Sequence, residues 1–511
     1  MASDLVFQDV SKTYGHHKVR RHVDLTVPAG SFVALMGANG AGKTTLLRMA
    51  SGLTAPTSGT VTLAGVDLRK AGPGLRRMLG FVSHDGLLYG DLTGRQNLLF
   101  HGRMFGVADA EARIEELADA LDLRKVLDRP AAVLSRGNRQ RLTLARALMH
   151  GPEVLLLDEP FTGLDEASCA RLVAMLRMLN AAGTTVVMTV HEAARATDGP
   201  TRLVVIGEGG VLVDDPITSS ESEFDSVASV ELALVGAGAS TGRASGTGDA
   251  PWVPAPTGSR HDHDDEPPAY VALDPNPARV TPPTRMRAAW LIAVKDMRVE
   301  LRSRDALGSA ALFAITVLIT ASFTSAPGGG SQGLATGILW ISLLFAVLLG
   351  VGRSMTRESQ DRAMEGLLLS PAPRESIFVG KLISGLAMMA VIEAFVVPMF
   401  LVLATGESAA TLDVPALVAV VVLATLGLVV IATLFSGIAV GSRMGESLLP
   451  LIVMPVAVPL MIAAVETTRR ALGGDAGGSV DMFQWFALLA GFDAVVGLAA
   501  IATFSFVVED Q

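Results

Sequence analysis

The chain has 511 residues, of which half are apolar, with a formal net charge of −9 and a single cysteine. It is too long for one ordinary domain, and an apolar fraction this high is unusual for a protein that is wholly dissolved in water. The lone Cys169 excludes an intrachain disulfide, and the acidic balance argues against nucleic-acid binding, which requires a basic face.

Shifts in composition predict two domains and a linker. Residues 1–220 predict a mixed α/β domain, and residues 285–511, with their long apolar runs, predict an all-α membrane domain. Residues 221–284 are rich in proline, glycine and acidic side chains and predict a disordered linker, because they offer little apolar surface to offset the entropy of ordering. The N-terminus lacks the basic start and apolar run of a signal peptide, so we expect the first domain in the cytoplasm.

The first elements in chain order are two short apolar stretches, 6–10 and 23–27, which predict a pair of strands. Tyr14 lies between them. A lone tyrosine is more often a core or turn residue, but an aromatic side chain shortly before a phosphate-binding loop can also stack on an adenine ring.

A glycine-rich loop follows the apolar run 31–36 and precedes a helical stretch at 46–50. This order of strand, loop and helix, with Lys-Thr in the loop, is typical of a P-loop that binds a nucleoside triphosphate. Its backbone N–H groups bind phosphate, Lys43 bridges the β- and γ-phosphates, and the Thr44 hydroxyl ligates Mg²⁺. The loop consists of Gly37, Ala38, Asn39, Gly40, Ala41, Gly42, Lys43, Thr44 and Thr45.

Two adjacent carboxylates end a second apolar run, at 154–157. Asp158 is suited to hold Mg²⁺ through its water shell, and Glu159 is suited to orient or deprotonate the attacking water. A strand end with two solvated acids is the simpler alternative, which the buried run before them disfavours.

The stretch 134–141 precedes a predicted helix at 142–150. Ser135 and Gly137, at the N-terminus of this helix, can present hydroxyl and N–H donors to a phosphate. Taken alone, the stretch predicts no more than a helix cap.

Together these motifs resemble the ATPases of ABC transporters over about residues 3–215. The resemblance implies that ATP and Mg²⁺ are sandwiched between the P-loop of one subunit and the signature of another, so that a homodimer is required. It also implies that Lys43, Glu159 and His191 are catalytic. The family elements occur in order: Tyr14 as the adenine-stacking aromatic, 37–45 as Walker A, 134–138 with Ser135, Gly137 and Asn138 as the signature, 155–159 as Walker B, 163–165 with Asp165 as the D-loop, and His191 as the switch histidine.

His84 stands where most members of that family have a glutamine that senses Mg²⁺ and the membrane domain. An imidazole titrates near neutrality, whereas an amide does not. We therefore hypothesise that hydrolysis depends on pH through His84. A second departure, Arg136 and Asn138 in place of the usual glycine and glutamine of the signature, leaves Ser135 and Gly137 intact.

Long apolar stretches in the second half predict six transmembrane helices, because each is close to the ~20 residues that a bilayer requires. An amphipathic stretch at 288–302 predicts an interfacial helix before them. Basic residues concentrate on one side, so we expect a multi-pass protein of the plasma membrane with both termini in the cytoplasm. The charged inner loop 353–381 is the predicted place of a coupling helix that contacts the ATPase. The six stretches are 306–324, 334–352, 382–404, 415–441, 448–465 and 483–507.

The second half resembles the membrane subunit of the haem exporter of cytochrome c maturation, the Ccm system, over nearly all of residues 286–508. The resemblance implies haem-handling membrane proteins and a haem chaperone as partners. No histidine or tyrosine lies beyond residue 270, so we expect any haem to be held by those partners. The motifs that carry the resemblance are Gly350–Ser354 with Glu358, 365–371, Gly380-Lys381, 448–451, 464–466 and Phe492-Asp493.

We interpret the chain as an ATP-driven half-transporter for haem export or delivery, or for release of the haem chaperone, in cytochrome c biogenesis. Two alternatives stay open: an ABC-2-type exporter of lipid, drug or polysaccharide, and a soluble ABC ATPase, which the apolar stretches oppose. Glu393 and Asp493 lie inside predicted spans. We expect them to have packing or partner-contact roles rather than to bind substrate.

Overall fold

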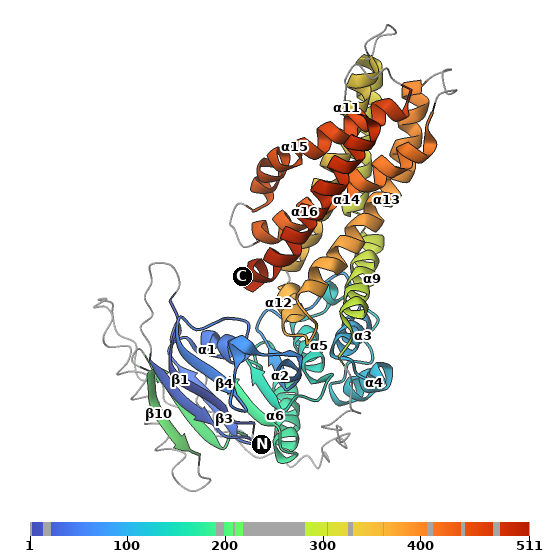
Figure 1. Cartoon of the computed structure of the whole chain (residues 1–511). Coiled ribbons are helices and arrows are strands. Elements are labelled where there is room, and N and C mark those ends of the chain that lie inside the picture. Colours follow the sequence, from blue (N-terminus) through green and yellow to red (C-terminus); the bar gives the residue numbers. More distant parts are fainter. Residues whose placement is uncertain are drawn as a thin grey trace, which may run out of the picture. The chain divides into compact units, whose positions relative to one another are not determined.

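The computed structural model describes residues 3–13, 22–190, 199–207, 210–217, 282–303, 305–324, 331–360, 362–405, 412–440, 445–473 and 481–509. The chain divides into two compact units (Figure 1). Unit 1 comprises Met1–His84, Asp109–Leu127 and Ser135–Ala278, and unit 2 comprises Asp85–Ala108, Asp128–Leu134 and Arg279–Gln511. All of the predicted linker except residues 282–284 lies outside the described residues.

Unit 1 contains a six-stranded sheet with the strand order β10-β9-β3-β8-β7-β6 (Figure 1). The strands from β9 to β6 run parallel, and β10 pairs antiparallel with β9 at one edge. The inner strands are buried along almost their whole length, as a parallel sheet covered on both faces requires. The strands are β3 (Phe32–Gly37), β6 (Leu79–Val82), β7 (Val154–Leu157), β8 (Thr185–Thr189), β9 (Arg202–Gly207) and β10 (Gly210–Pro216).

A smaller antiparallel sheet of unit 1 has the order β2-β1-β4-β5. The pair of strands predicted at its start is present, with Leu5 opposite Val27. Buried and exposed residues alternate along β2, as in a sheet with one face toward a core. These strands are β1 (Leu5–Ser11), β2 (Val23–Val27), β4 (Ser58–Leu63) and β5 (Val66–Asp67).

The helices of unit 1 lie between its strands in the chain. α1 follows β3 after the glycine-rich loop, and α6 lies between β7 and β8. The helix predicted at 142–150 begins earlier, at Arg136, because Ser135 caps its N-terminus. The helices are α1 (Lys43–Ala50), α2 (Pro73–Arg77), α4 (Ala110–Ala120), α5 (Arg136–Leu148) and α6 (Glu166–Ala181).

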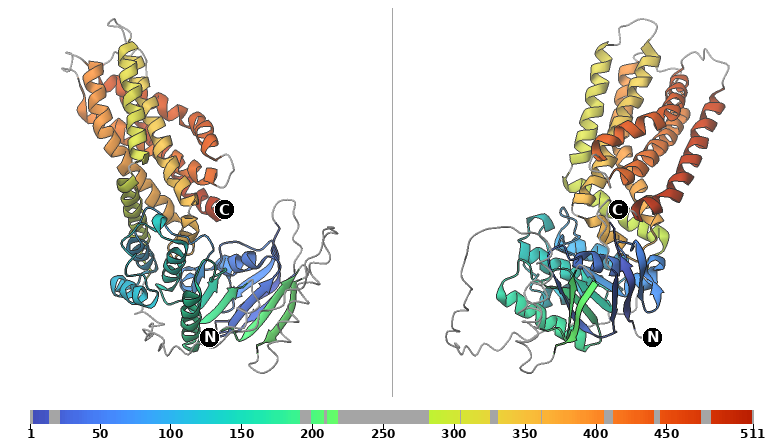
Figure 2. Two further views of the ribbon diagram at one scale, coloured as in Figure 1. Left: turned by 180° about the vertical axis from the view of Figure 1, so that it is seen from behind. Right: turned by 90° about the vertical axis from the view of Figure 1, so that its left-hand side faces the viewer.

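Unit 2 consists of helices, most of them long and apolar (Figure 2). From the first half of the chain it takes residues 85–108, which include α3, and the short segment 128–134. The helices are α3 (Gly94–Phe105), α9 (Arg285–Ser303), α10 (Asp305–Thr324), α11 (Ser331–Gln360), α12 (Ala363–Leu368), α13 (Glu375–Thr405), α14 (Val414–Val440), α15 (Gly445–Ala471) and α16 (Met482–Glu509).

Five helices among the described residues are long and apolar enough to cross a membrane: α11, α13, α14, α15 and α16. The first of the six predicted spans corresponds to α10. It counts as a sixth candidate only together with α9, from which it is bent by 70°. α11 and α14 form the centre of the bundle, since 61% of each apolar window is buried, against 17% for α16.

The centre of the bundle is held by apolar packing and one buried hydrogen bond between helices. Trp340 of α11 is fully buried, and its indole N–H donates to Thr468 Oγ1 of α15, 2.9 Å away. A buried tryptophan N–H without a partner would be costly, so this bond fixes the register of the two helices.

Candidate functional site

The glycine-rich loop between β3 and α1 has the backbone of a phosphate cradle. Gly37 has a φ of 154°, and a Cβ there would lie 2.3 Å from the carbonyl oxygen of Ile206, so only glycine fits. Lys43 is buried, and its Nζ donates to the carbonyl oxygens of Gly37 at 2.7 Å and of Ala38 at 3.2 Å. The loop therefore curls around its own lysine, next to the N–H groups of the first turn of α1.

A cavity of about 140 Å³ lies beside this loop. Its walls come from the loop, from α1 and from β1, β2 and β9, and they are mainly apolar. The signature residues Ser135 and Gly137 are not among the lining residues. The lining residues are Val10, Ser11, Lys12, Val23, Gly40, Ala41, Gly42, Thr45, Leu46, Met49 and Ile206.

Asp158 lies at the carboxyl end of β7 and is almost fully buried. Thr44 Oγ1 donates a hydrogen bond to its Oδ1 over 3.2 Å, and Thr189 Oγ1 donates to the same oxygen over 2.9 Å. Burial raises the pKa of Asp158, and the two hydroxyl donors partly oppose that rise. The two predicted ligands of Mg²⁺, Thr44 and Asp158, are thus in direct contact.

Glu159 follows with a φ of 51°, in the left-handed region, and its side chain is partly exposed. Its backbone N–H donates to Thr189 Oγ1 over 2.8 Å, and Thr162 Oγ1 lies 3.4 Å from Oε2. The Nδ1 atom of His84 is 3.9 Å from that same Oε2. His84 reaches this place because β6 pairs in parallel with β7, so that the ends of both strands meet at one edge of the sheet.

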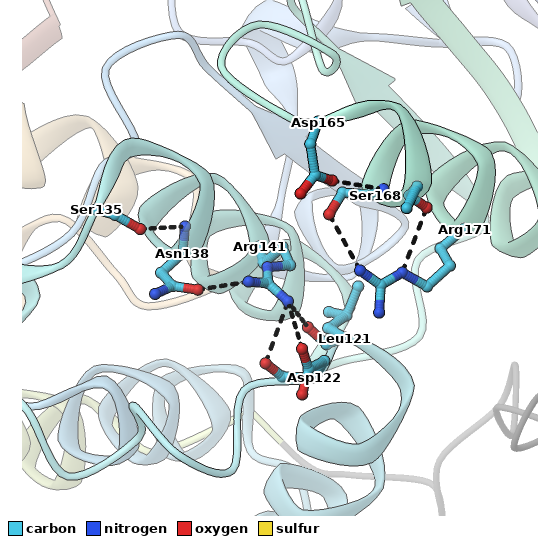
Figure 3. A network of polar contacts seen from close by, with 9 residues as sticks. Leu121, Asp122, Ser135, Asn138, Arg141, Asp165, Ser168 and Arg171 are labelled. Atoms are coloured by element: carbon cyan, nitrogen blue, oxygen red, sulfur yellow. Dashed lines mark hydrogen bonds and ion pairs between the residues drawn. The ribbon is translucent and has the colours of Figure 1, made fainter. Parts of the chain in front are cut away.

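The signature and the D-loop lie together within the same chain (Figure 3). Ser135 Oγ accepts a hydrogen bond from the Asn138 N–H, and Asp165 caps α6 by accepting from the Ser168 N–H. A Cβ at Gly137 would lie 3.3 Å from the carbonyl oxygen of Gly163. The α5 N-terminus therefore packs closely against the turn that leads into α6.

Asn138 belongs to a chain of polar contacts that the sequence did not indicate (Figure 3). Its Oδ1 accepts from Arg141 Nη2 over 2.6 Å, and Arg141 Nη1 donates to Asp122 Oδ2 over 3.0 Å. The same nitrogen also contacts the carbonyl oxygens of Leu121 and Asp122. This network ties the first turn of α5 to the end of α4.

Two predicted site residues, Tyr14 and His191, lie outside the described residues. One residue that the sequence reasoning missed is Thr189, which joins Asp158 to the backbone of Glu159. Leu157 pairs with Met188 in the parallel sheet, so Asp158 and Thr189 are the next residues of neighbouring strands. Only this pairing reveals the role of Thr189, since threonine is common in strands.

Within unit 2, the segment that follows His84 packs against the loop where a coupling helix was predicted. The structure has a short helix there, α12. A Cβ at Gly366 of α12 would lie 3.2 Å from the carbonyl oxygen of Leu87 and 3.4 Å from the His101 ring. Arg362 Nη1 pairs with Asp85 Oδ2 at 2.9 Å. The predicted coupling loop and the segment that follows His84 are thus in direct contact within unit 2.

Asn97 of α3 fixes the shape of that segment. It is fully buried, and its side-chain amide donates to the carbonyl oxygens of Tyr89, Leu92 and Thr93. Its Oδ1 accepts from the Tyr89 N–H over 2.8 Å. One side chain thus satisfies four backbone groups, which makes the loop rigid.

Unit 2 also buries a closed ring of four alternating charges. Lys295 and Asp296 of α9, Glu358 of α11 and Lys381 of α13 contact one another, with Lys381 Nζ 2.9 Å from Glu358 Oε1 and 3.1 Å from Asp296 Oδ2. Lys295 Nζ also lies 4.1 Å from the ring centre of Tyr89. The ring joins three helices of the bundle and, through Tyr89, the segment that follows His84.

Residues 20–162 match the family described as ABC transporter, and residues 287–508 match the family described as CcmB protein. Both resemblances expected from the sequence are thereby confirmed. A Nod factor export ATP-binding protein I of Burkholderia lata is 41% identical over 224 residues, which cover 43% of this chain and 73% of that protein. A sulfate/thiosulfate import ATP-binding protein of Mycobacterium tuberculosis is 40% identical over 41% of this chain and 61% of that protein.

A solved structure described as the dimeric post-hydrolysis state of an ATP-binding cassette, bound to ADP and Pi, is 27% identical to this chain. The match covers 42% of this chain and 99% of that one, with a TM-score of 0.40. The curated relatives are described as ATP-binding proteins and match about two fifths of this chain, whereas the CcmB match covers residues 287–508.

Proposed function

Because the chain belongs to the ABC transporter family and joins an ATP-binding domain to a CcmB-type membrane domain, we propose that it is an ATP-driven half-transporter of cytochrome c biogenesis. It acts as a homodimer that exports or delivers haem, or releases a haem chaperone. The observation that carries the proposal is the presence of both family matches in one chain. It is supported by the hydrogen bond between Thr44 of the P-loop and the buried carboxylate of Asp158.

The residues present fit ATP with Mg²⁺. The cavity beside the P-loop has apolar walls for a base and glycine N–H groups for phosphates, and the buried carboxylate of Asp158, which accepts from the Thr44 hydroxyl, is a ligand type that Mg²⁺ prefers. In this proposal Lys43, the loop amides and Tyr14 bind ATP, while Thr44 and Asp158 hold the metal. When bound, Mg²⁺ neutralises phosphate charge.

Glu159 is the proposed general base. Its carboxylate is partly exposed, so a water molecule can reach it, and Thr189 holds its backbone in place. His84 lies close enough to Glu159 Oε2 to orient the same water or to alter its charge. His191 and Asp165 complete the proposed site through the family resemblance.

The proposed homodimer rests on which residues one chain contributes to the cavity beside the P-loop. The cavity beside the P-loop is lined without Ser135 or Gly137, whose N-terminal turn of α5 is built to present donors to a phosphate. A second copy would bring that turn to the cavity. Closure of two copies on ATP would then move the segment after His84, which packs on α12 within unit 2.

A deletion strain tests the haem assignment. We expect loss of holocytochrome c, measured by haem staining of membrane proteins, with restoration by the parent chain and none by a Glu159→Gln chain expressed at the same level. Normal holocytochrome in the deletion strain would remove the haem role. Restoration by Glu159→Gln would instead show that the role does not require hydrolysis.

A second candidate function is export of a lipid, drug or polysaccharide, as in an ABC-2-type exporter. It is favoured by the curated relatives, several of which are described as Nod factor export ATP-binding proteins. The same deletion strain separates the two, because normal cytochromes together with altered export or surface chemistry would support the exporter.

A further inference from the structure

Asp493 is an acidic side chain at the middle of α16, within the apolar stretch Met482–Phe504. It is 8% exposed, and neither carboxyl oxygen has a hydrogen-bond partner within the described part of the chain. It faces α14, since a Cβ added at Gly427 would lie 2.4 Å from Asp493 Oδ1. That same position is 2.9 Å from the side chain of Leu460 on α15. The carboxyl group therefore fills a space that only glycine at 427 leaves open.

A second acid lies on the other flank of α14. Glu393 of α13 is partly buried and accepts a hydrogen bond from Thr425 Oγ1. Thr425 and Gly427 are two residues apart at the middle of the span Val414–Ala439. Two carboxyl groups thus approach α14 at nearly the same level, from two different neighbouring helices.

No described cation is placed to neutralise Asp493. α14 has no ionisable residue along its whole length. On α15, Glu446 is in the first turn, and Glu466 is bound by Arg469 and Arg470 in the last turns. On α13, Glu375 is at the start, and Lys381 belongs to the buried ring with Asp296 and Glu358. Among the ionisable residues of α13, α14 and α15, Glu393 is therefore the one that lies closest to Asp493 along the direction of the spans.

An ionised carboxylate without a partner in an apolar interior is costly, whereas the neutral acid can be buried at far smaller cost. The space beside Gly427 is occupied by the side chains of Asp493 and Leu460. We propose that Asp493 is a proton-binding site of the membrane domain. Its carboxyl group is neutral while α16 packs against α14, and it releases the proton to water when separation of the two helices lets water reach it.

The low burial of α16 favours such release. Of the five candidate spans it has the smallest buried share, 17%, so its separation from α14 breaks the fewest apolar contacts. Conformational change in the membrane domain would then be linked to uptake and release of one proton per chain. The proposal requires that α16 lies in the membrane, and it does not depend on haem as the substrate.

Labelling with dicyclohexylcarbodiimide tests the site, because this apolar reagent modifies neutral carboxyl groups in apolar surroundings. The full chain in lipid nanodiscs is treated across a range of pH, and the α16 peptide is read by mass spectrometry. We expect an N-acylurea on Asp493 whose yield falls about tenfold per pH unit above the titration midpoint. Asp493→Asn abolishes this label, and the label on Glu393 serves as an internal control.

Three results would overturn the proposal. Asp493 could remain unlabelled at every pH while Glu393 reacts, or its label could be independent of pH. Asp493 could also be unlabelled in native membranes and yet react in the purified protein. That result would show that a cation from another membrane protein keeps Asp493 ionised. Thermal unfolding gives a second readout: we expect the parent to lose stability relative to Asp493→Asn as pH rises, and a constant difference would contradict proton binding.

Discussion

The hydroxyl group of Thr44 donates a hydrogen bond to the carboxylate of Asp158, with 3.2 Å between Oγ1 and Oδ1. The two residues are more than a hundred positions apart in the sequence, on a helix start and on a strand end. Their contact brings the P-loop and the acidic strand end into one site.

Thr189 offers the most direct test of this geometry. Thr189→Val keeps the shape but removes the hydroxyl that donates to Asp158 and accepts from the Glu159 N–H. We expect ATP hydrolysis to fall by about 10- to 100-fold, because a hydrogen bond to a charged group contributes roughly 1.5–3 kcal/mol. ATP binding, measured by fluorescence, should change little. Thr189→Ser is the matched control, and equal loss in both variants would contradict the role of the hydroxyl.

Glu159→Gln should bind ATP without turning it over. Loss of a general base lowers the rate by about 10²–10⁴-fold. Because the site needs two copies, native mass spectrometry of the variant should show a dimer that retains two ATP molecules. A variant that hydrolyses ATP at the parental rate, or binds it only as a monomer, would argue against the sandwich.

Asp158→Asn should make the nucleotide-free protein more stable. Burial raises the pKa of Asp158 in the folded state, so its favourable contribution is present below the unfolded pKa and is lost as pH rises through the folded pKa. At neutral pH the variant should unfold at a higher Tm than the parent, and it should lose its response to Mg²⁺ with ATP.

The exposed carboxylate Asp165 is the control for that measurement. Asparagine also caps a helix, so Asp165→Asn should leave the Tm almost unchanged. If Asp158→Asn lowers the Tm across the pH range, the buried carboxylate is stabilising and the expectation is wrong.

His84→Gln tests the pH hypothesis. The Nδ1 atom of His84 is 3.9 Å from Glu159 Oε2, so a change in the imidazole charge would change the electrostatic potential at the proposed base. We expect the rate of ATP hydrolysis by the parent to depend on pH in a way that His84→Gln does not share. Identical pH–rate profiles in the two proteins would remove His84 from the hydrolysis step.

Lys295→Met should destabilise unit 2 strongly. The change leaves Asp296 and Glu358 buried with only Lys381 to compensate them, and breaking a buried ion pair costs about 3–5 kcal/mol. Arg285→Gln is the control, because the Arg285–Glu375 pair is exposed and such pairs contribute about 1 kcal/mol or less. Thermal unfolding monitored by size-exclusion chromatography in detergent compares the two, and equal Tm values would show that the ring is dispensable.

Local patterns indicated much of the fold. The loop at 37–45 lies between a strand and a helix as expected, because glycine spacing and the flanking apolar runs are short-range signals. The apolar stretches from 334 onward are long helices, since length and apolarity alone satisfy the criterion for a span. The span predicted at 306–324 corresponds to α10, which meets the criterion for a span only together with α9, from which it is bent by 70°.

The boundary between the units was not visible in composition. Residues 85–108 belong by sequence to the ATPase motifs but pack with the membrane-type helices. Their apolar side chains, such as Tyr89, Phe100 and Met104, share a core with α9, α12 and α13. Sequence patterns cannot show this, because an apolar helix face does not identify the surface that will cover it.

The sequence by itself determined three local features: a phosphate-binding loop, a pair of carboxylates and a set of apolar helices. Each of them depends on residues that are close together in the chain. Only the tertiary structure decided which distant groups meet. Thr189 holds Asp158 through strand pairing, four charges close a ring across three helices, and Gly427 leaves room for Asp493. These contacts depend on the register of packed strands and helices, which is set by the fit of whole surfaces rather than by any local pattern.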